Sequence, residues 1–469
     1  LAALGERRLL ALGTLLAVTP LAAAAGMLVI GFAVAFSGIG GPRLAGLANG
    51  MQLLYILPCF PPYAPATLPM RLVGLGVGVG LLILADRLLW PAPAPPSYRG
   101  RVADVTGLVR ARLASLSAAA DPGRRLAGDE RTHLTTVDRE TAEAVDGLRM
   151  SGLPPATCPA GPGARDRGLT HTAAALQALH ERLTGLAAIL ARAGAGAAPA
   201  GTSELLTTTG RTLADVRAAL AGAGPAPSAR PVELAHADYT ASRLRELADP
   251  APRGDLAGWA AIGAEATAAA DIVRTMVLGT RAATGAAEPA SAAADTGPTG
   301  AFWYARASEP ALWRRRLRAH LTPRSIYLQN AVRLALGLAI ARLVAGGLDV
   351  AHGFWVLLAV LTVMRTSVAT TGSALVPALL GTVAGALVTA GIIATGPPLA
   401  VYAALLPVTL VLALFSAPIA GIGLGQGCFT VAVALLFAQL SPVDWRLAET
   451  RLVDVLVGGL VGLLVGIIA

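Results

Sequence analysis

The sequence predicts an all-α, polytopic membrane protein in which two homologous transmembrane halves flank a cytoplasmic helical domain. Three observations support this prediction. The 469 residues are 55% hydrophobic, with a mean hydropathy of +0.63, which is more apolar than soluble domains usually are. The apolar residues fall into two separate blocks, with most charged residues between them. Short phrases recur in the same order in both apolar blocks, as an internal repeat would.

Composition divides the chain into a first transmembrane half at 1–90, a helical domain with linkers at 91–325 and a second transmembrane half at 326–469. The Pro-rich stretch PAPAPP (Pro91–Pro96) is a boundary that no helix can cross. The segment 97–325 holds 27 Arg and 22 acidic residues. This mixed charge fits a domain near anionic lipid, whereas a nucleic-acid binder would concentrate its positive charge on one face.

The apolar blocks contain about ten spans, some shorter than the roughly 20 residues that cross a bilayer core. They lie near 7–19, 20–36, 43–60, 69–90, 328–346, 351–365, 375–395, 400–416, 419–440 and 451–469. We expect loops at the breaks between them, including "TTGS" (Thr370–Ser373) and "SAP" (Ser416–Pro418). A complete six-plus-six arrangement would place about two further spans before Leu1.

The middle domain is predicted to be a helical bundle. Apolar residues recur at three- and four-residue intervals in stretches that begin at Tyr98, Arg167 and Leu256, and Pro/Gly-rich segments separate them. Arginines flank this domain on both sides, which places it in the cytoplasm. The loops at Gly346–Ala351 and Ser441–Thr450 then face outward, and the chain beyond Ala469 returns to the cytoplasm.

Three pairs of short motifs indicate the repeat. "RLVGLGVGVGLLIL" from Arg71 matches "RLVDVLVGGLVGLL" from Arg451, and "GLANG" (Gly46–Gly50) matches "GLGQG" (Gly423–Gly427). "LGT" occurs at 12–14 and again at 380–382. Each match is weak in Gly/Leu-rich sequence, but three in the same order favour a duplication.

Two stretches of the second block resemble the fusaric-acid-resistance-like family, which includes the aromatic acid exporters. Gly353–Val388 shows that family's aromatic start at Phe354–Trp355, a Thr/Ser-rich turn at Thr366–Ser373, and "GT…G" from Gly381. Pro442–Gly459 resembles its closing helix, in which Arg and Asp precede a Gly. Family members often carry an Arg before "GT", whereas this chain has Pro-Ala-Leu-Leu there.

The resemblance implies a multi-pass protein of the bacterial plasma (inner) membrane that exports aromatic or other hydrophobic weak organic acids. We expect a secondary, proton-coupled transporter and not an enzyme. Its partners would be a small organic anion and the lipid bilayer, with no nucleic acid and no cofactor, and a homodimer is the oligomer favoured. A passive organic-anion channel and a non-transporting scaffold with a partner-binding cytoplasmic domain are the alternatives.

Charges within the spans are the first candidates for the transport pathway, because charges in a bilayer are costly and usually paired or functional. Arg451 and Asp454 share a helix face, so they either form an anchoring ion pair or meet a carboxylate and a proton. The repeat keeps Arg71 but has Gly74 in place of the acid. Arg342 lies deep in its span and is a candidate pathway residue.

Four polar or aromatic residues complete the candidate pathway. His352 is either a surface-loop residue or a proton relay, and Trp355 either an interfacial aromatic or a stacking surface for substrate. Asn49 and Gln426 align in the repeat and either line a central path or tie helices together. Three scattered cysteines and six scattered histidines indicate no metal site or disulfide scaffold, and no P-loop, GxSxG or HExxH motif occurs.

Overall fold

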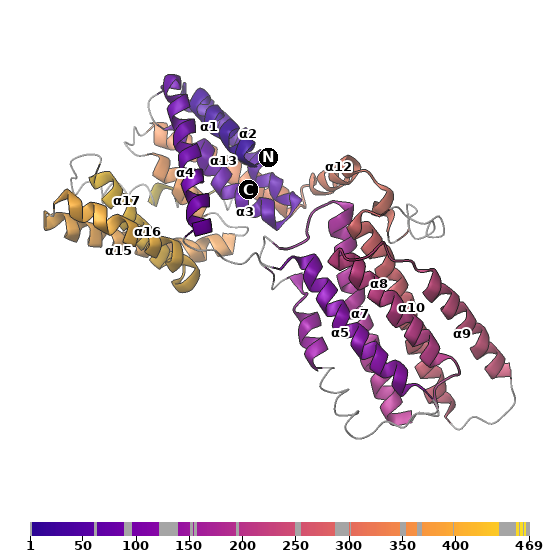
Figure 1. Cartoon of the computed structure of the whole chain (residues 1–469). Coiled ribbons are helices and arrows are strands. Elements are labelled where there is room, and N and C mark those ends of the chain that lie inside the picture. Colours follow the sequence, from indigo (N-terminus) through magenta and orange to yellow (C-terminus); the bar gives the residue numbers. More distant parts are fainter. Residues whose placement is uncertain are drawn as a thin grey trace. The chain divides into compact units, whose positions relative to one another are not determined.

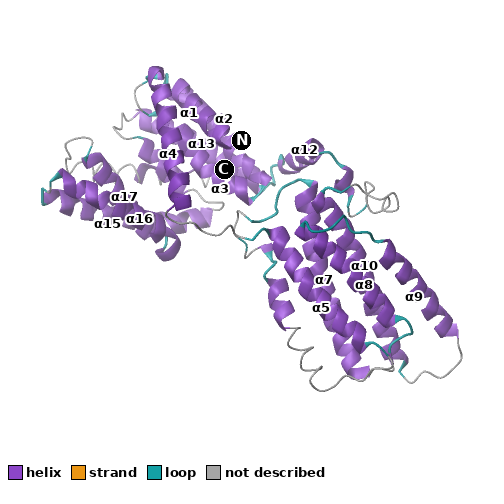
Figure 2. Ribbon diagram, in the orientation of Figure 1, coloured by secondary structure: helices purple, strands orange, loops and turns teal. Residues whose placement is uncertain are grey.

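Helix is the only regular secondary structure in the part of the chain that the structure describes (Figure 2). The structure is a computed structural model that describes residues 2–60, 63–88, 96–121, 139–150, 153, 157–193, 197–248, 255–286, 300, 302–347, 353–363, 368–396, 398–439, 456–458, 460–462 and 464–465. This confirms the all-helical prediction for those residues.

The chain divides into two compact units (Figure 1). The first comprises Leu1–Ile39, Leu44–Ala92 and Arg318–Ala469, and we call it the membrane unit. The second comprises Gly40–Arg43 and Pro93–Leu317, and we call it the bundle. The membrane unit therefore contains residues of both apolar blocks.

Helices occur at each position where the sequence predicts a span. Those of the membrane unit are α1 (Ala2–Leu16), α2 (Pro20–Phe36), α3 (Pro42–Ile56), α4 (Leu68–Leu88), α13 (Ile326–Gly347), α14 (Phe354–Val363), α15 (Val368–Ala394), α16 (Leu399–Ala420) and α17 (Ile422–Ala438). Helical residues continue at 456–458, 460–462 and 464–465. The break between α1 and α2 is specified locally, because Thr19 caps α2 by accepting a hydrogen bond from the Ala22 amide at 3.1 Å, and Pro20 occupies the first helical position.

Two predicted loops are instead helical. Thr370–Ser373 lies within the first two turns of α15, and Ser416–Pro418 lies within the last turns of α16. Small and hydroxyl residues break a helix in water because they compete for backbone hydrogen bonds, but in membrane helices they are common. The chain breaks instead at Gly421, whose φ of +90° suits glycine.

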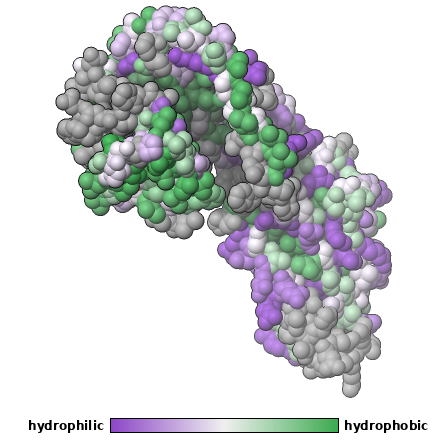
Figure 3. Space-filling view, turned by 60° about the vertical axis from the view of Figure 1, so that its left-hand side comes forward, coloured by the Kyte–Doolittle hydropathy of each residue, from purple (hydrophilic) through white to green (hydrophobic). Residues whose placement is uncertain are grey.

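The core of the membrane unit joins the two apolar blocks. Helix α2 packs along α13, and buried residues of α1, α2 and α3 cluster with those of α13 and α14 and with Val461 and Val465. Many of the unit's other large apolar side chains are exposed; Met70 is 76% exposed and Leu387 is 69% exposed. Figure 3 shows hydrophobic residues gathered on the surface of this unit and mostly hydrophilic ones on the bundle. Apolar surface on this scale fits contact with lipid.

Four described helices are long and apolar enough to cross a membrane. They are Pro20–Gly40, Leu256–Thr284, Ile326–Gly347 and Val376–Ala394. Three of them belong to the membrane unit. These apolar helices indicate that the chain is a helical membrane protein. The number of spans and the homology of the two halves stay predictions.

The bundle consists mainly of five long helices. They are α5 (Tyr98–Ala119), α7 (Ala164–Ala193), α8 (Thr202–Ala221), α9 (Arg230–Ala248) and α10 (Leu256–Thr284), followed by η7 (Trp303–Arg306) and α12 (Glu309–His320). Helix α10 contacts α7, α8 and α9, and its residues Ile262, Ala266 and Val273 are fully buried. Its position in the core explains why it is apolar enough to resemble a span.

The sequence analysis predicted α5, α7 and α10 nearly to the residue, and it missed α8 and α9. Helix α8 is rich in Thr, a poor helix former. Its buried Leu205, Leu213, Val216 and Leu220 nevertheless lie on one helical face, so the same periodicity would have found it.

Candidate functional site

Arg342 is a buried cation in the core of the membrane unit. It extends from α13 and is 8% exposed. One end nitrogen, Nη2, donates a hydrogen bond to the carbonyl of Cys59 at 3.3 Å. Its Nε is buried and has no hydrogen-bond partner among the described residues. Arg342 therefore retains donor capacity inside the protein, where an unmade hydrogen bond is costly.

Aromatic rings surround this guanidinium. It lies over the ring of Phe60, 4.7 Å from the centroid, and the Phe60 ring is tilted against that of Phe354 with the centroids 6.4 Å apart. Gly346 makes room for the arginine, because a Cβ there would lie 2.9 Å from Nη1 of Arg342 and 3.0 Å from Cβ of Pro20. A cation beside phenyl rings can recognise both parts of an aromatic carboxylate.

Cys59 connects this site to a second arginine. Its thiol donates to the carbonyls of Tyr55 at 3.2 Å and Gly13 at 3.5 Å. The next residue, Thr14, accepts a hydrogen bond from Nη1 of Arg71 at 3.2 Å. A chain of contacts thus links Arg71 to Arg342 through one junction between α1 and the residues that follow α3.

Sequence reasoning missed three members of this junction. Cys59 and Phe60 lie in "LPCFPPY", at the end of the predicted span 43–60, and Cys59 was interpreted only as one of three scattered cysteines. Thr14 was noticed only as part of the repeated "LGT". The sequence does contain a signal for Cys59 and Phe60. Prolines end the apolar span at this point, and an aromatic and a polarisable side chain lie between them.

Carboxylates are scarce around these arginines. Among the side chains that the structure describes in the membrane unit, Glu6 is the one acid. No ion pair involves Arg342 or Arg71 within the described residues. Both cations are therefore open to an anion that the described part of the protein does not supply.

Of the other predicted pathway residues, the structure describes the side chains of two, Asn49 and Gln426. Asn49 is exposed on α3, and Gln426 is half-buried on α17. Trp355 belongs to α14, but its side chain lies outside the described residues, as do His352, Arg451 and Asp454. The structure tests none of these roles.

Glycines join α15 and α17 at very short range. A Cβ on Gly381 would collide with the carbonyl of Gly423, and one on Gly385 with the carbonyl of Gly427. Gly458 is in a similarly close contact, because a Cβ there would lie 2.5 Å from the carbonyl of Val356. Gly76 and Gly80, in the equivalent motif of the first half, have nothing within 4 Å among the described residues. The "GT…G" and "GLGQG" motifs are thus packing elements in the second half.

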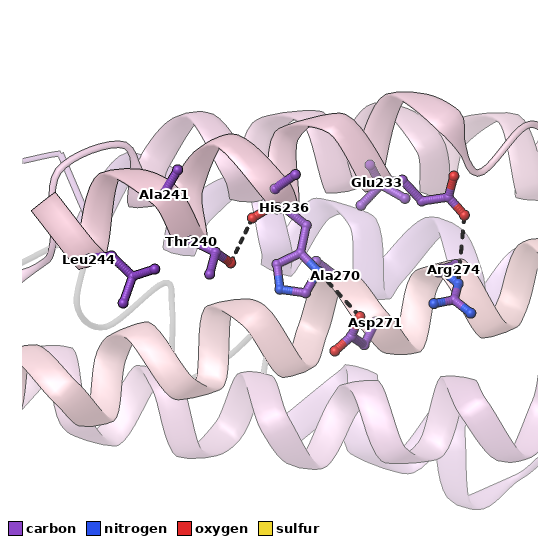
Figure 4. A pocket seen from close by; sticks show the side chains of 10 residues that line it. Glu233, His236, Thr240, Ala241, Leu244, Ala270, Asp271 and Arg274 are labelled. Atoms are coloured by element: carbon purple, nitrogen blue, oxygen red, sulfur yellow. Dashed lines mark hydrogen bonds and ion pairs between the residues drawn. The ribbon is translucent and has the colours of Figure 1, made fainter.

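The bundle carries a groove of about 400 Å³ between α9 and α10 (Figure 4). Two polar contacts cross it: Nδ1 of His236 lies 3.4 Å from Oδ1 of Asp271, and Nε of Arg274 forms an ion pair with Oε1 of Glu233 at 3.7 Å. Because these side chains contact one another, we interpret this groove as a contact between helices and not as a ligand site.

One comparison with known proteins bears on the membrane unit. Residues 336–465 match the model of a family described as fusaric acid resistance protein-like. The match includes both stretches on which the resemblance was predicted, and it confirms that resemblance. No curated protein matches the chain, and no solved structure matches it.

Proposed function

We propose that this chain, whose second membrane block is a fusaric acid resistance protein-like domain, is a secondary transporter that exports aromatic or other hydrophobic weak acids. Export is coupled to proton movement across the bacterial inner membrane, and the bundle lies in the cytoplasm. The organic anion binds at Arg342, with its ring against Phe60 and Phe354.

The observation that carries this proposal is the incomplete hydrogen bonding of Arg342. A buried arginine with a structural role alone is normally paired or fully hydrogen-bonded. Arg342 has one backbone acceptor, an aromatic face and an unused Nε among the described residues. A carboxylate can accept two parallel N–H donors from a guanidinium, so it would satisfy the remaining donors.

The predicted repeat extends this proposal to the second half. Thr14 and Thr382 occupy equivalent positions in "LGT", both are buried, and each hydroxyl donates to the carbonyl four residues earlier at 2.9 Å. Arg71 contacts Thr14, and Arg451 is its equivalent in the repeat. Asp454, which lacks a counterpart after Arg71, is the proton carrier in this proposal.

Flux of benzoate in proteoliposomes, with and without an imposed pH gradient, tests the proposal. Coupled export predicts that the gradient drives benzoate above its equilibrium concentration on one side. Replacing Asp454 with Asn should abolish this uphill movement, whereas Glu at that position should preserve it. Equal final concentrations with and without the gradient would contradict proton coupling.

A passive anion channel is the second candidate. It is favoured by the small number of acids in the apolar blocks of the sequence, two in residues 1–96 and four in residues 326–469, since a channel needs no proton acceptor. A channel predicts that the Asp454→Asn variant keeps full downhill flux and that the wild type performs no uphill movement. The same liposomes therefore separate the two candidates.

A further inference from the structure

A second groove in the bundle has a different distribution of charge from the one in Figure 4. It lies between α5 and α8 and has a volume of about 440 Å³, within the range of small-molecule sites. Its residues are Arg110, Ala114, Ser117, Ala118 and Asp121 of α5, and Ser203, Leu206, Thr207, Gly210, Arg211 and Ala214 of α8.

Two arginines lie close together in this groove. Helices α5 and α8 are antiparallel, because Gly107 neighbours Arg217 whereas Ser117 contacts Ser203 and Thr207. This register sets Arg110 and Arg211 about 4.5 Å apart along the helix axes, at a rise of about 1.5 Å per residue. Neither forms an ion pair or hydrogen bond with any residue that the structure describes. Two unpaired like charges on facing helices repel one another, so an anion between them is favourable.

Hydroxyl groups join the two helices at one end of the groove, about 10 Å along α5 from Arg110 at about 1.5 Å per residue. The oxygen of Ser117 is 2.8 Å from the carbonyl of Ser203, 2.8 Å from Oγ1 of Thr207 and 3.3 Å from Oγ of Ser203. The three hydroxyl protons of this group can satisfy these three contacts, so the hydroxyls hold α5 against α8 and the arginines carry the binding of an anion.

Apolar side chains form the rest of the groove. They are Ala114, Ala118, Leu206 and Ala214, with Gly210 between them. Asp121 is the one acid, and it lies about 16 Å along α5 from Arg110, at about 1.5 Å per residue. A ligand with a carboxylate at one end and an apolar body can thus place each part against a matching surface.

We propose that the α5/α8 groove binds an organic carboxylate with an apolar body, held by Arg110 and Arg211 and resting on the alanines. The site belongs to the bundle and does not depend on Arg342. It gives this protein a second ligand site outside the membrane unit, suited to sensing the concentration of an organic acid.

Equilibrium dialysis of radiolabelled benzoate against the purified full chain in detergent tests this proposal. The variant Arg110→Gln/Arg211→Gln should weaken one class of sites at least about tenfold, because it removes both charged hydrogen-bond donors to the carboxylate. Arg192→Gln, an exposed arginine at the end of α7, is the matched control and should leave binding unchanged. Ala114→Trp fills the groove without changing its charge and should have the same effect as the double variant.

Further binding measurements distinguish this site from the proposed transport site at Arg342. Arg342→Gln should remove the other class of sites and leave the groove intact, so failure of one proposal is distinguishable from failure of the other. Unlabelled benzamide, which lacks the charge, should not compete at the groove, and inorganic phosphate should compete more weakly than benzoate. Unchanged binding in the double variant, or competition by phosphate equal to that by benzoate, would overturn the proposal.

Discussion

Two arginines, one in each unit, are buried to a similar extent but in different ways. Arg112 of the bundle is 2% exposed, and Arg342 of the membrane unit is 8% exposed. Arg112 donates to Nδ1 of His180 at 2.8 Å and to Oγ1 of Thr184 at 3.1 Å. Arg342 donates to one carbonyl, and its Nε has no partner among the described residues.

The difference indicates which arginine holds the fold together and which is available to a ligand. Arginine only donates hydrogen bonds, so His180 must accept at Nδ1 and is neutral, with its proton on Nε2. Arg112 therefore fixes the tautomer of His180 and links α5 to α7. Burial alone does not identify a functional cation; the informative quantity is the number of donors that the fold leaves unused.

The largest expected difference between Arg112 and Arg342 is the effect of their replacement on the stability of the fold. Arg112→Met removes two hydrogen bonds from a charged donor that link α5 to α7, and we expect a loss of about 3 kcal/mol. Arg342→Met removes a charge that is poorly compensated, and we expect no loss or a small gain. Hydrogen exchange of α5 and α13 peptides in the full chain measures both effects. Equal destabilisation by the two variants would refute the distinction.

The junction between Arg71 and Arg342 should show a smaller effect. Thr14→Val removes the hydroxyl that accepts from Arg71, and we expect a loss of about 1 kcal/mol in the stability of the membrane unit. Thr14→Ser keeps the hydroxyl and serves as the control. A double-mutant cycle with Arg342→Gln measures whether the two arginines are coupled, and strictly additive effects would show that they are independent.

The smallest expected effect is a dependence of the stability of the bundle on pH. Burial lowers the pKa of His171, and the neighbouring Arg167 lowers it further. The Tyr304 hydroxyl lies 3.0 Å from Nδ1 of His171. Because the folded pKa is depressed below the ordinary value of about 6.5, this contribution to stability is complete above that pH and declines as the pH falls through it.

Comparison of wild type with His171→Gln isolates that contribution. Thermal unfolding followed from pH 8 to pH 5 should show a steeper decline for the wild type than for the variant. Parallel curves would mean that protonation of His171 does not affect the fold.

The sequence predicted the helices well and the arginine junction poorly. Periodicity located α5, α7 and α10 because their apolar faces are buried, and hydropathy placed a helix at each predicted span. The loops predicted at Thr370–Ser373 and Ser416–Pro418 were wrong, because small residues do not break membrane helices as they break helices in water.

Arg342 could be selected from the sequence, since a charge in an apolar span is conspicuous. Its partners could not be selected, because Cys59 and Phe60 lie about 280 residues earlier in the chain and reach Arg342 only in the folded protein. The same limit applies to the α5/α8 groove, since Arg110 and Arg211 are about a hundred residues apart and resemble many other surface arginines.

Counterflow of benzoate by wild-type protein and Arg342→Gln in matched proteoliposomes tests the central claim most directly. Liposomes loaded with unlabelled benzoate should transiently accumulate labelled benzoate through the wild type, because a carrier exchanges its anion across the membrane. The variant should lose this accumulation by about a hundredfold, the value of two charged hydrogen bonds at about 1.5 kcal/mol each, and Arg342→Lys should restore only part of it. Undiminished counterflow in Arg342→Gln would contradict the assignment of Arg342 as the anion site.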